Sequence, residues 1–519
     1  MATDGTGAND LESSRVQAGH LGIEGPFGVP VPASEESVSL AKDELNLFDA
    51  TAVAVSSTAP AYSLASAMAS LFIIGSVGLH APAMVILSFI PILFIAYAYF
   101  HLNRRNPNCG ASYAWLSEVF HPAAGWFNGF IQVGISVIFC VQAPIVAATY
   151  TMSFLNSVGW VNASTASSTK LLTIVAVLWL VLITFFCIYG IRWTTNFQWV
   201  LCIIEYVAVI VFSVGGIIKV ALAGPGHHYT SFSVSWLNPL QVHGLGNLAA
   251  AMAVGTFLFW GWDTAVNLNE ESKNPSRTPG RAAIISMWLL LLIFVINFVA
   301  AEMLLPAKDL ENPNANLLFV FGQQFAGNWA GYILIFAVLS STVATTQTTL
   351  LPAARITYSM SRDHVFPKLF ATIHPKTKTP ALGTAILGIL ALVGIVVVNY
   401  NSTAGNIIAT FTLNVGALVA FYYGATGVAC AWAFRKAWRE SAKFTLLGIA
   451  LPLLGGIVLL VIFGYDLYTG GWSGMKWDIM LLIISAVLTP IVWFTKRDVP
   501  FFNQPMVSYD TIEQPVAVG

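Results

Sequence analysis

The chain has 519 residues, of which 56% are hydrophobic and only 9% are charged, and its formal net charge at pH 7 is −1. So few polar residues cannot cover a water-soluble domain of this size. The composition therefore excludes a soluble globular protein and predicts a polytopic membrane protein. The net charge itself says nothing about partners.

Residues 1–44 are rich in Gly, Ser, Glu and Ala and predict a disordered tail. Leu40–Asp49, where this tail ends, is amphipathic and predicts a segment along the membrane surface. Twelve apolar segments follow, each about long enough to cross ~30 Å of hydrocarbon as a helix. They lie at about 50–77, 83–102, 125–154, 171–189, 199–220, 255–275, 282–305, 330–358, 382–399, 407–434, 446–463 and 479–494. We predict an all-α polytopic membrane protein with twelve transmembrane helices.

Lysine and arginine are distributed unevenly between the two sides of this topology. Most of them fall in the loops from even to odd spans and in the C-terminal segment. The exceptions on the other face are Lys170, Lys219, Lys308 and Lys476. By the positive-inside rule, we expect a multi-pass protein of the cell membrane with both termini in the cytoplasm.

Two spans contain residues that interrupt a helix. Span 1 carries the run Ser56, Ser57, Thr58, Ala59 and Pro60, in which proline removes a backbone donor. An unwound turn at membrane depth is tolerated only where it is buried in protein or lines a cavity. The run therefore predicts a broken helix whose freed backbone groups lie at a binding site.

The second interruption lies in span 6, where Phe259, Trp260, Gly261 and Trp262 precede Asp263. Glycine among bulky aromatic residues is a poor helix former and permits an unwound turn. Asp263 lies about halfway along the span, where an acid costs roughly 2.5 to 3.5 kcal/mol on insertion scales. Such an acid usually belongs to a substrate, ion or proton path; the alternative is an acid satisfied by neighbouring Ser and Thr hydroxyls.

The two breaks are five spans apart, which indicates a transporter with inverted repeats and a site near the midplane. We predict a five-plus-five inverted repeat followed by two C-terminal helices. The expected parts are the tail 1–44, a transporter core of spans 1–10 (45–435), spans 11 and 12 (436–497) and a cytoplasmic C-terminal tail (498–519). Half-helix ends can take the carboxylate and the amine of an amino acid.

Glu205 is a second intramembrane acid, in span 5, with no basic residue near it in sequence. It is a candidate proton carrier, or an ion ligand together with Ser340, Ser341 and Thr342. The alternative is a neutral acid that is hydrogen-bonded to a neighbouring helix.

Three other charged residues have simpler interpretations. We expect Glu302 to be interfacial and Glu118 to be a solvated surface acid. Arg355 either extends its side chain to the interface or forms a structural ion pair.

Four places in the chain resemble the amino acid/polyamine/organocation transporter superfamily, which has the LeuT-type fold. They are the broken span 1, the loop 107–113, the stretch 259–275 and the stretch 354–367. The resemblance implies that the unwound parts of spans 1 and 6 hold substrate, and that Phe257 and Trp262 occupy gate and wall positions. The chain departs from many family members in lacking a Gly-Ser-Gly turn in span 1 and in carrying acids at 205 and 263.

The leading interpretation is a secondary active amino acid transporter that works by alternating access, with a proton or sodium as the coupling ion and the proton preferred. The alternative is a putrescine, polyamine or cationic amino acid carrier or exchanger. A channel or receptor would be expected to have a ring-forming filter or a large ligand-binding outer domain, and the predicted outward loops are too short for the latter. The five cysteines form no CxxC pair and the histidines form no HExxH-like group. We expect no metal site, no cofactor, no enzymatic activity and no nucleic acid partner.

Overall fold

The computed structural model describes residues 40, 42–188, 191–223, 229–310, 316–401 and 404–509. The predicted disordered tail lies almost entirely outside the described residues. Within them every regular element is helical, apart from an isolated bridge between Leu45 and Ser272. The all-α prediction is confirmed.

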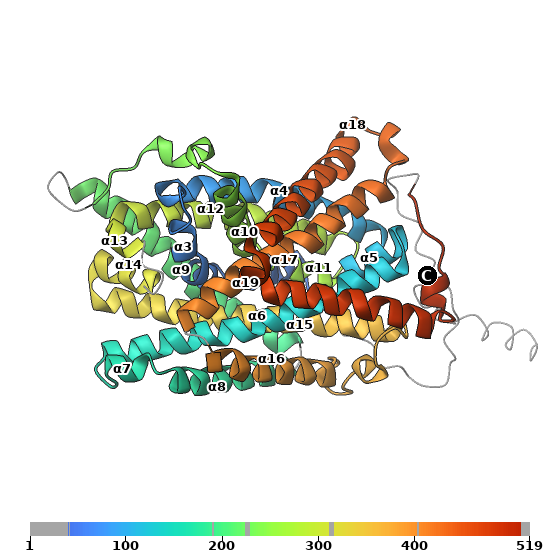
Figure 1. Cartoon of the computed structure of the whole chain (residues 1–519), viewed down its shortest axis with the longest axis horizontal. Helices are drawn as coiled ribbons and strands as arrows, with labels where there is room; N and C mark the ends of the chain where they lie inside the picture. Colours follow the sequence, from blue (N-terminus) through green and yellow to red (C-terminus); the bar gives the residue numbers. More distant parts are fainter. Residues whose placement is uncertain are drawn as a thin grey trace, which may run out of the picture. The chain divides into compact units, whose positions relative to one another are not determined.

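Nine of the described helices are long and apolar enough to cross a membrane, which agrees with a polytopic membrane protein. They are α4 (Ala81–Arg105), α6 (Pro122–Ser157), α8 (Thr169–Ile188), α9 (Ile191–Ala223), α12 (Thr278–Leu304), α15 (Asn328–Arg362), α16 (Ala381–Asn401), α17 (Ala404–Ala433) and α19 (Leu451–Lys496). In the bundle, α6 packs against α15, α4 against α12, and α17 against α19, while α8 and α16 run side by side (Figure 1).

The shorter helices connect or extend these nine. They are α2 (Leu47–Thr58), α3 (Pro60–Phe72), α5 (Ser112–Val119), α7 (Ala163–Ala166), α10 (Leu245–Leu258), α11 (Thr264–Asn267), α13 (Ala307–Leu310), α14 (Leu317–Ala326) and α18 (Ala442–Phe444). Short 3-10 helices and one π-helical segment complete the set. The 3-10 helices are η1 (Gly78–His80), η2 (Val234–Leu237), η3 (Pro239–Gln241), η4 (Asn269–Glu271), η5 (Lys368–Ala371), η6 (Ala437–Arg439) and η8 (Pro500–Asn503), and the π-helical segment is η7 (Thr445–Ala450).

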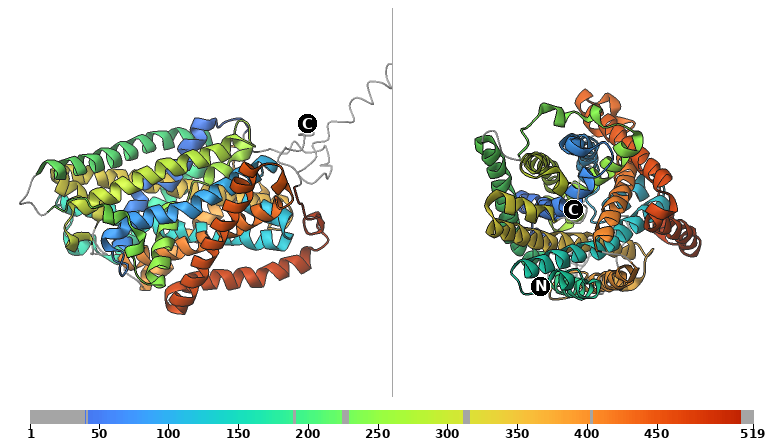
Figure 2. Two further views of the ribbon diagram at one scale, coloured as in Figure 1. Left: turned by 90° about the horizontal axis from the view of Figure 1, so that it is seen from above. Right: turned by 60° about the vertical axis from the view of Figure 1, so that its left-hand side comes forward.

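Helix α19 consists of two legs. Gly471 (φ 52°, ψ −158°) and Met475 (φ −117°, ψ 24°) have non-helical backbone angles in its middle. The chain turns back on itself there, as the red ribbon shows (Figure 2). The two legs correspond to the segments predicted at 446–463 and 479–494.

Large apolar side chains on several helices are exposed. Leu178 on α8 is 64% exposed, Val207 on α9 57%, Leu292 on α12 59% and Ile483 on α19 54%. Backbone polar groups in these helices are satisfied internally, so such a surface suits hydrocarbon rather than water. The lipid bilayer is the environment that this surface fits.

Residues 500–509, here called the C-terminal strap, pack against the helical bundle. The Val507 amide donates to the carbonyl oxygen of Glu118 (2.9 Å), and the Tyr509 amide donates to that of Ala433 (2.9 Å). The Tyr509 hydroxyl lies 3.3 Å from Glu118 Oε2, and the Arg105 guanidinium lies 4.9 Å from the Tyr509 ring centre. The strap therefore joins α5 to the ends of α4 and α17.

The expectation that Glu118 is a solvated surface acid is wrong, because the strap folds over it. Asn106 Nδ2 and the Tyr509 hydroxyl donate to its carboxylate at 3.1 and 3.3 Å. Burial raises the pKa of Glu118 above its usual value, and these two hydrogen bonds offset only part of that rise.

We predict that docking of the strap weakens as pH rises. The pKa of Glu118 is raised in the docked state, so docking favours the protonated acid and is lost as pH rises through the raised pKa. A spin label at Met506→Cys, a site that is 69% exposed, should become more mobile with rising pH. In the Glu118→Gln variant, which cannot titrate, mobility should stay constant; an unchanged pH response there would contradict the prediction.

Candidate functional site

The two predicted helix breaks are present, and they touch each other. Between α2 and α3, Ala59 adopts a left-handed conformation (φ 49°, ψ 73°), and Pro60 begins α3. Between α10 and α11, Gly261 has φ +116°. A side-chain carbon at 261 would lie 2.9 Å from the backbone carbon and oxygen of Ser57, so only glycine permits this approach.

Helix α15 supplies hydrogen bonds to both unwound turns. The Thr345 hydroxyl donates to the Ser57 carbonyl oxygen at 2.7 Å. The Thr264 hydroxyl lies 2.8 Å from that of Ser57 and donates to the Thr348 carbonyl oxygen at 3.1 Å. The Ser57 carbonyl oxygen, next to the first break, is thus satisfied by a side chain, as a membrane interior requires.

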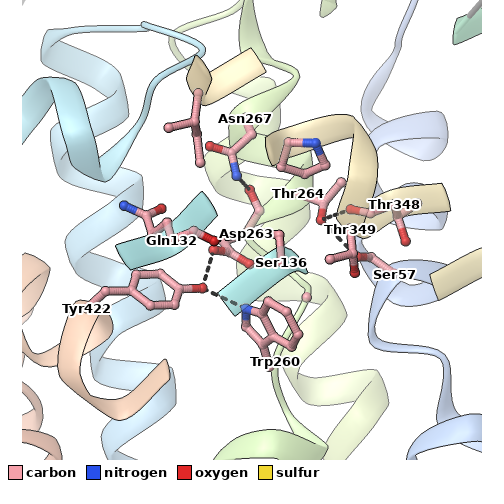
Figure 3. Close-up of a pocket in the computed structure, with 13 residues that line it drawn as sticks. Ser57, Gln132, Ser136, Trp260, Asp263, Thr264, Asn267, Thr348, Thr349 and Tyr422 are labelled. Atoms are coloured by element: carbon pink, nitrogen blue, oxygen red, sulfur yellow. Dashed lines mark hydrogen bonds between the residues drawn. The ribbon is translucent and has the colours of Figure 1, made fainter. Parts of the chain in front are cut away.

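A narrow cavity, with a volume of about 30 Å³ for water-sized molecules, lies where the two turns meet (Figure 3). This space is enough for about two water molecules and is far below the roughly 300 to 1,000 Å³ typical of small-molecule sites, so the cavity is nearly closed in this conformation. The lining residues come from α2, α6, the turn before α11, α11 itself, α15 and α17: Ser57, Gln132, Ser136, Trp260, Gly261, Asp263, Thr264, Asn267, Thr348, Thr349, Pro352, Ile356 and Tyr422.

Asp263 is the acidic group of this cavity. The residue is 5% exposed, and its Oδ2 accepts a hydrogen bond of 2.8 Å from the Tyr422 hydroxyl. Trp260 Nε1 donates to that hydroxyl oxygen at 2.7 Å, so the two aromatic side chains orient the carboxylate (Figure 3). The acid is therefore held by a phenol rather than by the Ser and Thr hydroxyls of the alternative interpretation. Its carboxylate therefore forms part of the cavity wall.

The predicted substrate residues divide into two groups. Ser57, Trp260, Gly261 and Asp263 line the cavity. The other seven are packed beside it: Ser56, Thr58, Ala59, Pro60, Phe257, Phe259 and Trp262.

Four of these seven residues make contacts away from the cavity. The Ser56 and Thr58 hydroxyls donate to carbonyl oxygens of their own helix at 3.2 Å. Phe259 packs on Phe294, with ring centres 5.2 Å apart, and Trp262 packs on Tyr99 at 5.0 Å.

Seven polar lining residues were not predicted. They come from α6, α11, α15 and α17: Gln132, Ser136, Thr264, Asn267, Thr348, Thr349 and Tyr422. A glutamine inside the apolar span 3 and the threonines that extend the hydroxyl-rich stretch of span 8 are signals that could have identified some of them.

Glu205 caps the half-helix α3 from a distant part of the chain. Its Oε1 accepts the Ala61 amide hydrogen at 2.7 Å and the Ser341 hydroxyl hydrogen at 2.8 Å. Ser341 in turn accepts the Tyr62 amide at 2.9 Å. The first amides of a helix lack internal partners and carry partial positive charge, so an acid is stabilised there.

The proposed ion ligands around Glu205 are only partly assembled. Ser341 contacts the carboxylate, whereas Ser340 and Thr342 donate to Ala337 and Val338 carbonyl oxygens of their own helix at 2.9 and 2.7 Å. The second oxygen of Glu205 is buried without a hydrogen-bond partner among the described residues.

An aromatic layer, made of Tyr62, Phe139, Phe257 and Trp260, lies on one side of the cavity. Phe139 contacts Tyr62 and Trp260 with ring centres 5.3 and 5.1 Å apart, and Phe257 lies 6.2 Å from Phe139. Farther along α3 and α6 lies a second and larger cavity, with a volume of about 430 Å³. The aromatic layer separates the two spaces.

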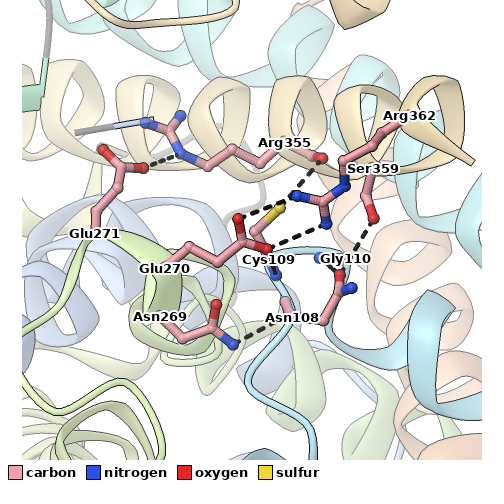
Figure 4. Close-up of polar contacts among 9 residues, drawn as sticks. All are labelled: Asn108, Cys109, Gly110, Asn269, Glu270, Glu271, Arg355, Ser359 and Arg362. Carbon is pink, nitrogen blue, oxygen red and sulfur yellow. Dashed lines mark hydrogen bonds and ion pairs between the residues drawn. The ribbon is translucent and has the colours of Figure 1, made fainter. Parts of the chain in front are cut away.

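The opposite side is closed by an acid–arginine clamp, made of Glu270, Glu271, Arg355 and Arg362 (Figure 4). Arg355 Nε lies 2.6 Å from Glu271 Oε1, and both side chains are fully buried. Of the two interpretations of Arg355, the structural ion pair is correct. Arg362 bonds both oxygens of Glu270 at 3.2 Å, and these side chains are 28% and 26% exposed.

The loop before α5 and the segment before α2 reinforce the clamp. The Cys109 amide donates to Glu270 Oε1 at 2.9 Å, and the Glu44 amide donates to the Glu271 carbonyl oxygen at 2.9 Å. Burial alone would raise the pKa of Glu270, but the charge of Arg362 and the hydrogen bonds from Arg362 and the Cys109 amide hold it below its usual value. The segment predicted to lie along the membrane surface thus pairs, at residues 44 and 45, with the loop after α11 instead.

Glu302 is another buried acid, and it lies near the C-terminal end of α12. Its interfacial position stays a prediction, because burial within the protein does not give its depth in the membrane. The residue is 1% exposed, and neither carboxylate oxygen has a hydrogen-bond partner in the described part of the chain. Helices α13 and α14 pack over the end of α12 and remove Glu302 from the surface.

Comparison with known proteins identifies the family. Residues 53–501 match the family model described as amino acid permease. The chain is 25% identical over 417 residues to the low-affinity putrescine importer PlaP of Escherichia coli, covering 79% of this chain and 86% of that protein. It is 26% identical over 328 residues to the human large neutral amino acids transporter small subunit 2, covering 62% of this chain and 58% of that protein.

A plant relative shows the same degree of similarity. The chain is 24% identical over 305 residues to the vacuolar cationic amino acid transporter 4 of Arabidopsis thaliana, covering 57% of this chain and 49% of that protein. The family match extends over most of the chain and includes both broken helices, the clamp and α19. This protein therefore belongs to the amino acid permease family.

Proposed function

We propose that this permease is a secondary active transporter that carries an amino acid, together with protons, by alternating access. The observation that carries the proposal is the buried cavity where the two unwound turns meet, with the carboxylate of Asp263 in its wall. Broken helices that meet at membrane depth are the usual site of substrate in transporters built from inverted repeats.

The proposed topology has twelve crossings. The pairs α2–α3 and α10–α11 each make one crossing, the two legs of α19 make two, and eight other long helices make one each. The two broken pairs then begin two inverted five-helix repeats, and both termini lie in the cytoplasm of a cell-membrane protein. In this orientation the acid–arginine clamp faces the cytoplasm and the second cavity faces outward.

Alternating access follows from two barriers that lie on opposite sides of the cavity. The aromatic layer closes the outer path, and the clamp closes the inner path. Substrate reaches Asp263 when the aromatic layer parts, and it leaves when the clamp separates. The test is uptake into proteoliposomes, with labelled amino acids and diamines, with and without a proton gradient. Absence of uptake of every substrate by correctly inserted protein would overturn the proposal.

The capping of α3 favours a second candidate substrate class, namely diamines and cationic amino acids. In transporters of this kind, half-helix N-termini usually receive the carboxylate of the substrate. Here the Ala61 and Tyr62 amides already bond Glu205 and Ser341, so a substrate carboxylate would have to compete for them. A diamine has no carboxylate to place, and one of its amines can pair with Asp263.

We predict that Asp263→Asn distinguishes the two substrate classes. Loss of the charge should weaken binding of a diamine or a cationic amino acid at least tenfold, about 1.4 kcal/mol, and affect a neutral amino acid less. Competition against labelled substrate in proteoliposomes measures both affinities. Tyr422→Phe, which removes only the supporting hydroxyl, is the matched control. Equal affinity of wild type and Asp263→Asn for every cationic substrate would exclude Asp263 from the site.

We predict that Glu205→Gln uncouples transport from the proton gradient. The amide oxygen can still accept the Ala61 hydrogen and cap α3, but the side chain cannot release a proton. Accumulation driven by a pH gradient should be lost, while exchange of internal for external substrate continues. Glu302→Gln, which changes a buried acid outside the cavity lining, should retain accumulation. Accumulation by the Glu205→Gln variant under a proton gradient alone would exclude this role.

We predict that the two ion pairs of the clamp contribute unequally to stability. Arg355→Met leaves the fully buried Glu271 without its partner and should cost about 3 to 5 kcal/mol. Arg362→Met breaks a pair that is part exposed and should cost less than about 1 kcal/mol. Denaturant unfolding in mixed micelles compares them, and a double variant with Arg355→Met and Glu271→Met should regain part of the loss. Equal destabilisation by the two single changes would contradict the prediction.

A further inference from the structure

The buried apolar side chains of the bundle form two large clusters. The first cluster contains most of those of α4, α12 and α17. The second cluster contains those of α8 and α16 and most of those in the part of α15 after residue 342. Protein interiors are packed as densely as organic crystals, so each cluster resists deformation. A movement that opens the bundle is therefore expected at the boundary between the clusters.

The acid–arginine clamp crosses this boundary. Arg355 precedes Ile356, a member of the second cluster, on α15. Its partner Glu271 belongs to the loop after α11, and that loop is tied to α4 because Asn269 Nδ2 donates to Asn103 Oδ1 at 2.8 Å. The clamp thus joins an element of the second cluster to a loop that is bonded to the first.

The C-terminal strap begins in the second cluster. Phe501 and Phe502 belong to it and are 3% and 8% exposed. The Phe501 ring stacks on that of Tyr113 at the start of α5, with the ring centres 5.7 Å apart and 12° between the planes. The Tyr113 hydroxyl donates to Asp363 Oδ2 at 2.7 Å, and Asp363 directly follows Arg362 of the clamp. The beginning of the strap is therefore fixed to the end of α15.

The end of the described strap packs on the first cluster. The Tyr509 ring lies 5.1 Å from that of Phe434 on α17, which is a member of this cluster. The Tyr509 amide donates to the Ala433 carbonyl oxygen, and the Arg105 guanidinium at the end of α4 lies over the Tyr509 ring. The strap thus ends on α17 and α4.

Helix α5 lies at the boundary, under the strap. Its residue Tyr113 belongs to the second cluster, whereas Trp115 belongs to the first. Trp115 Nε1 also donates to the Asn106 carbonyl oxygen at the end of α4, at 2.8 Å. The strap bonds α5 through the Val507 amide and the Glu118 carbonyl oxygen. The clamp and the strap therefore cross the same boundary at two places.

We propose that the C-terminal strap is a latch that holds the clamp closed and has to leave one of the two clusters before the clamp opens. The proposal rests on the proposed function in one respect, that the clamp is the inner barrier. Opening of the clamp moves the end of α15 relative to the loop after α11, and the hydrogen bond between Tyr113 and Asp363 links that end to Phe501. Because Tyr509 is held by α17 and α4, this movement pulls on the strap until one of its ends is released.

The test uses Cys109, which is fully buried and whose amide bonds Glu270 of the clamp. Its reaction with a water-soluble maleimide, followed by mass spectrometry of peptides from the purified full-length protein, reports opening of the clamp. The Phe501→Ala/Phe502→Ala variant removes the anchor of the strap in the second cluster. Cys109 should react at least tenfold faster in this variant than in wild type. Met506→Ala changes an exposed side chain of the same strap and should leave the rate unchanged.

Two other cysteines reveal unfolding in the same experiment. Cys140 on α6 and Cys187 on α8 are fully buried within the second cluster. Both should stay unmodified in every variant. Reaction of all three cysteines together would show that the strap only stabilises the fold, and it would overturn the proposal. An unchanged reaction rate of Cys109 in the double-alanine variant overturns it as well.

A pair of spin labels distinguishes opening of the clamp from local exposure of Cys109. The labels are placed at Lys273→Cys and Lys368→Cys, which are exposed sites in the loop after α11 and after the end of α15. In a Cys109→Ser background, the double-alanine variant should gain a longer distance between the labels, and the Met506 control should not. The proposal requires this change together with the faster reaction of Cys109, and an unchanged distance overturns it. Neither measurement needs a substrate, so failure of the latch is distinguishable from failure to transport in the uptake assay.

Discussion

The contact between Gly261 and the backbone of Ser57 is the constraint on which the rest of this structure depends. A broken helix inside a membrane frees amides and carbonyls that lipid cannot satisfy. This protein places its two broken turns against each other. The Thr345 hydroxyl of α15 donates to the Ser57 carbonyl oxygen, and the Thr264 hydroxyl donates to the Thr348 carbonyl oxygen of α15. The cavity exists because two unwound turns leave less bulk at their crossing than two continuous helices would. Its polar lining comes partly from the broken segments and partly from α6, α15 and α17.

The same need for backbone partners explains Glu205. Pro60 starts α3 inside the bundle, and the next two amides have no partners within the helix. Glu205 and Ser341 supply them, which places an acid at the positive end of a half-helix dipole. The Glu205 carboxylate thus stabilises the start of α3 in any conformation in which it accepts the Ala61 amide hydrogen. Its second oxygen, without a partner in the described chain, is the atom available for a proton under the proposed coupling.

The sequence predicts the local features of the site well and the long-range ones poorly. Pro60, Gly261 and Asp263 are conspicuous within their own segments, and the structure shows the breaks at these positions. Tyr422 belongs to a helix far along the chain, and a tyrosine in an apolar span has no local signal that pairs it with Asp263. Glu118 was misread for a related reason. The sequence shows an acid in a short interfacial helix, but nothing local shows that the C-terminal strap folds over it.

The two barriers around the cavity differ in chemistry, and this difference matters for alternating access under the proposed mechanism. The aromatic layer is held by ring contacts, each worth about 0.5 to 1.5 kcal/mol, and it can part without uncovering a charge. The clamp includes the fully buried pair of Arg355 and Glu271, and separating that pair is costly unless water enters as it opens. Glu270 and Arg362, which are already part exposed, provide the edge where water can enter first. The inner barrier would then open from its exposed pair towards its buried pair, so hydration of the clamp and release of substrate would occur together.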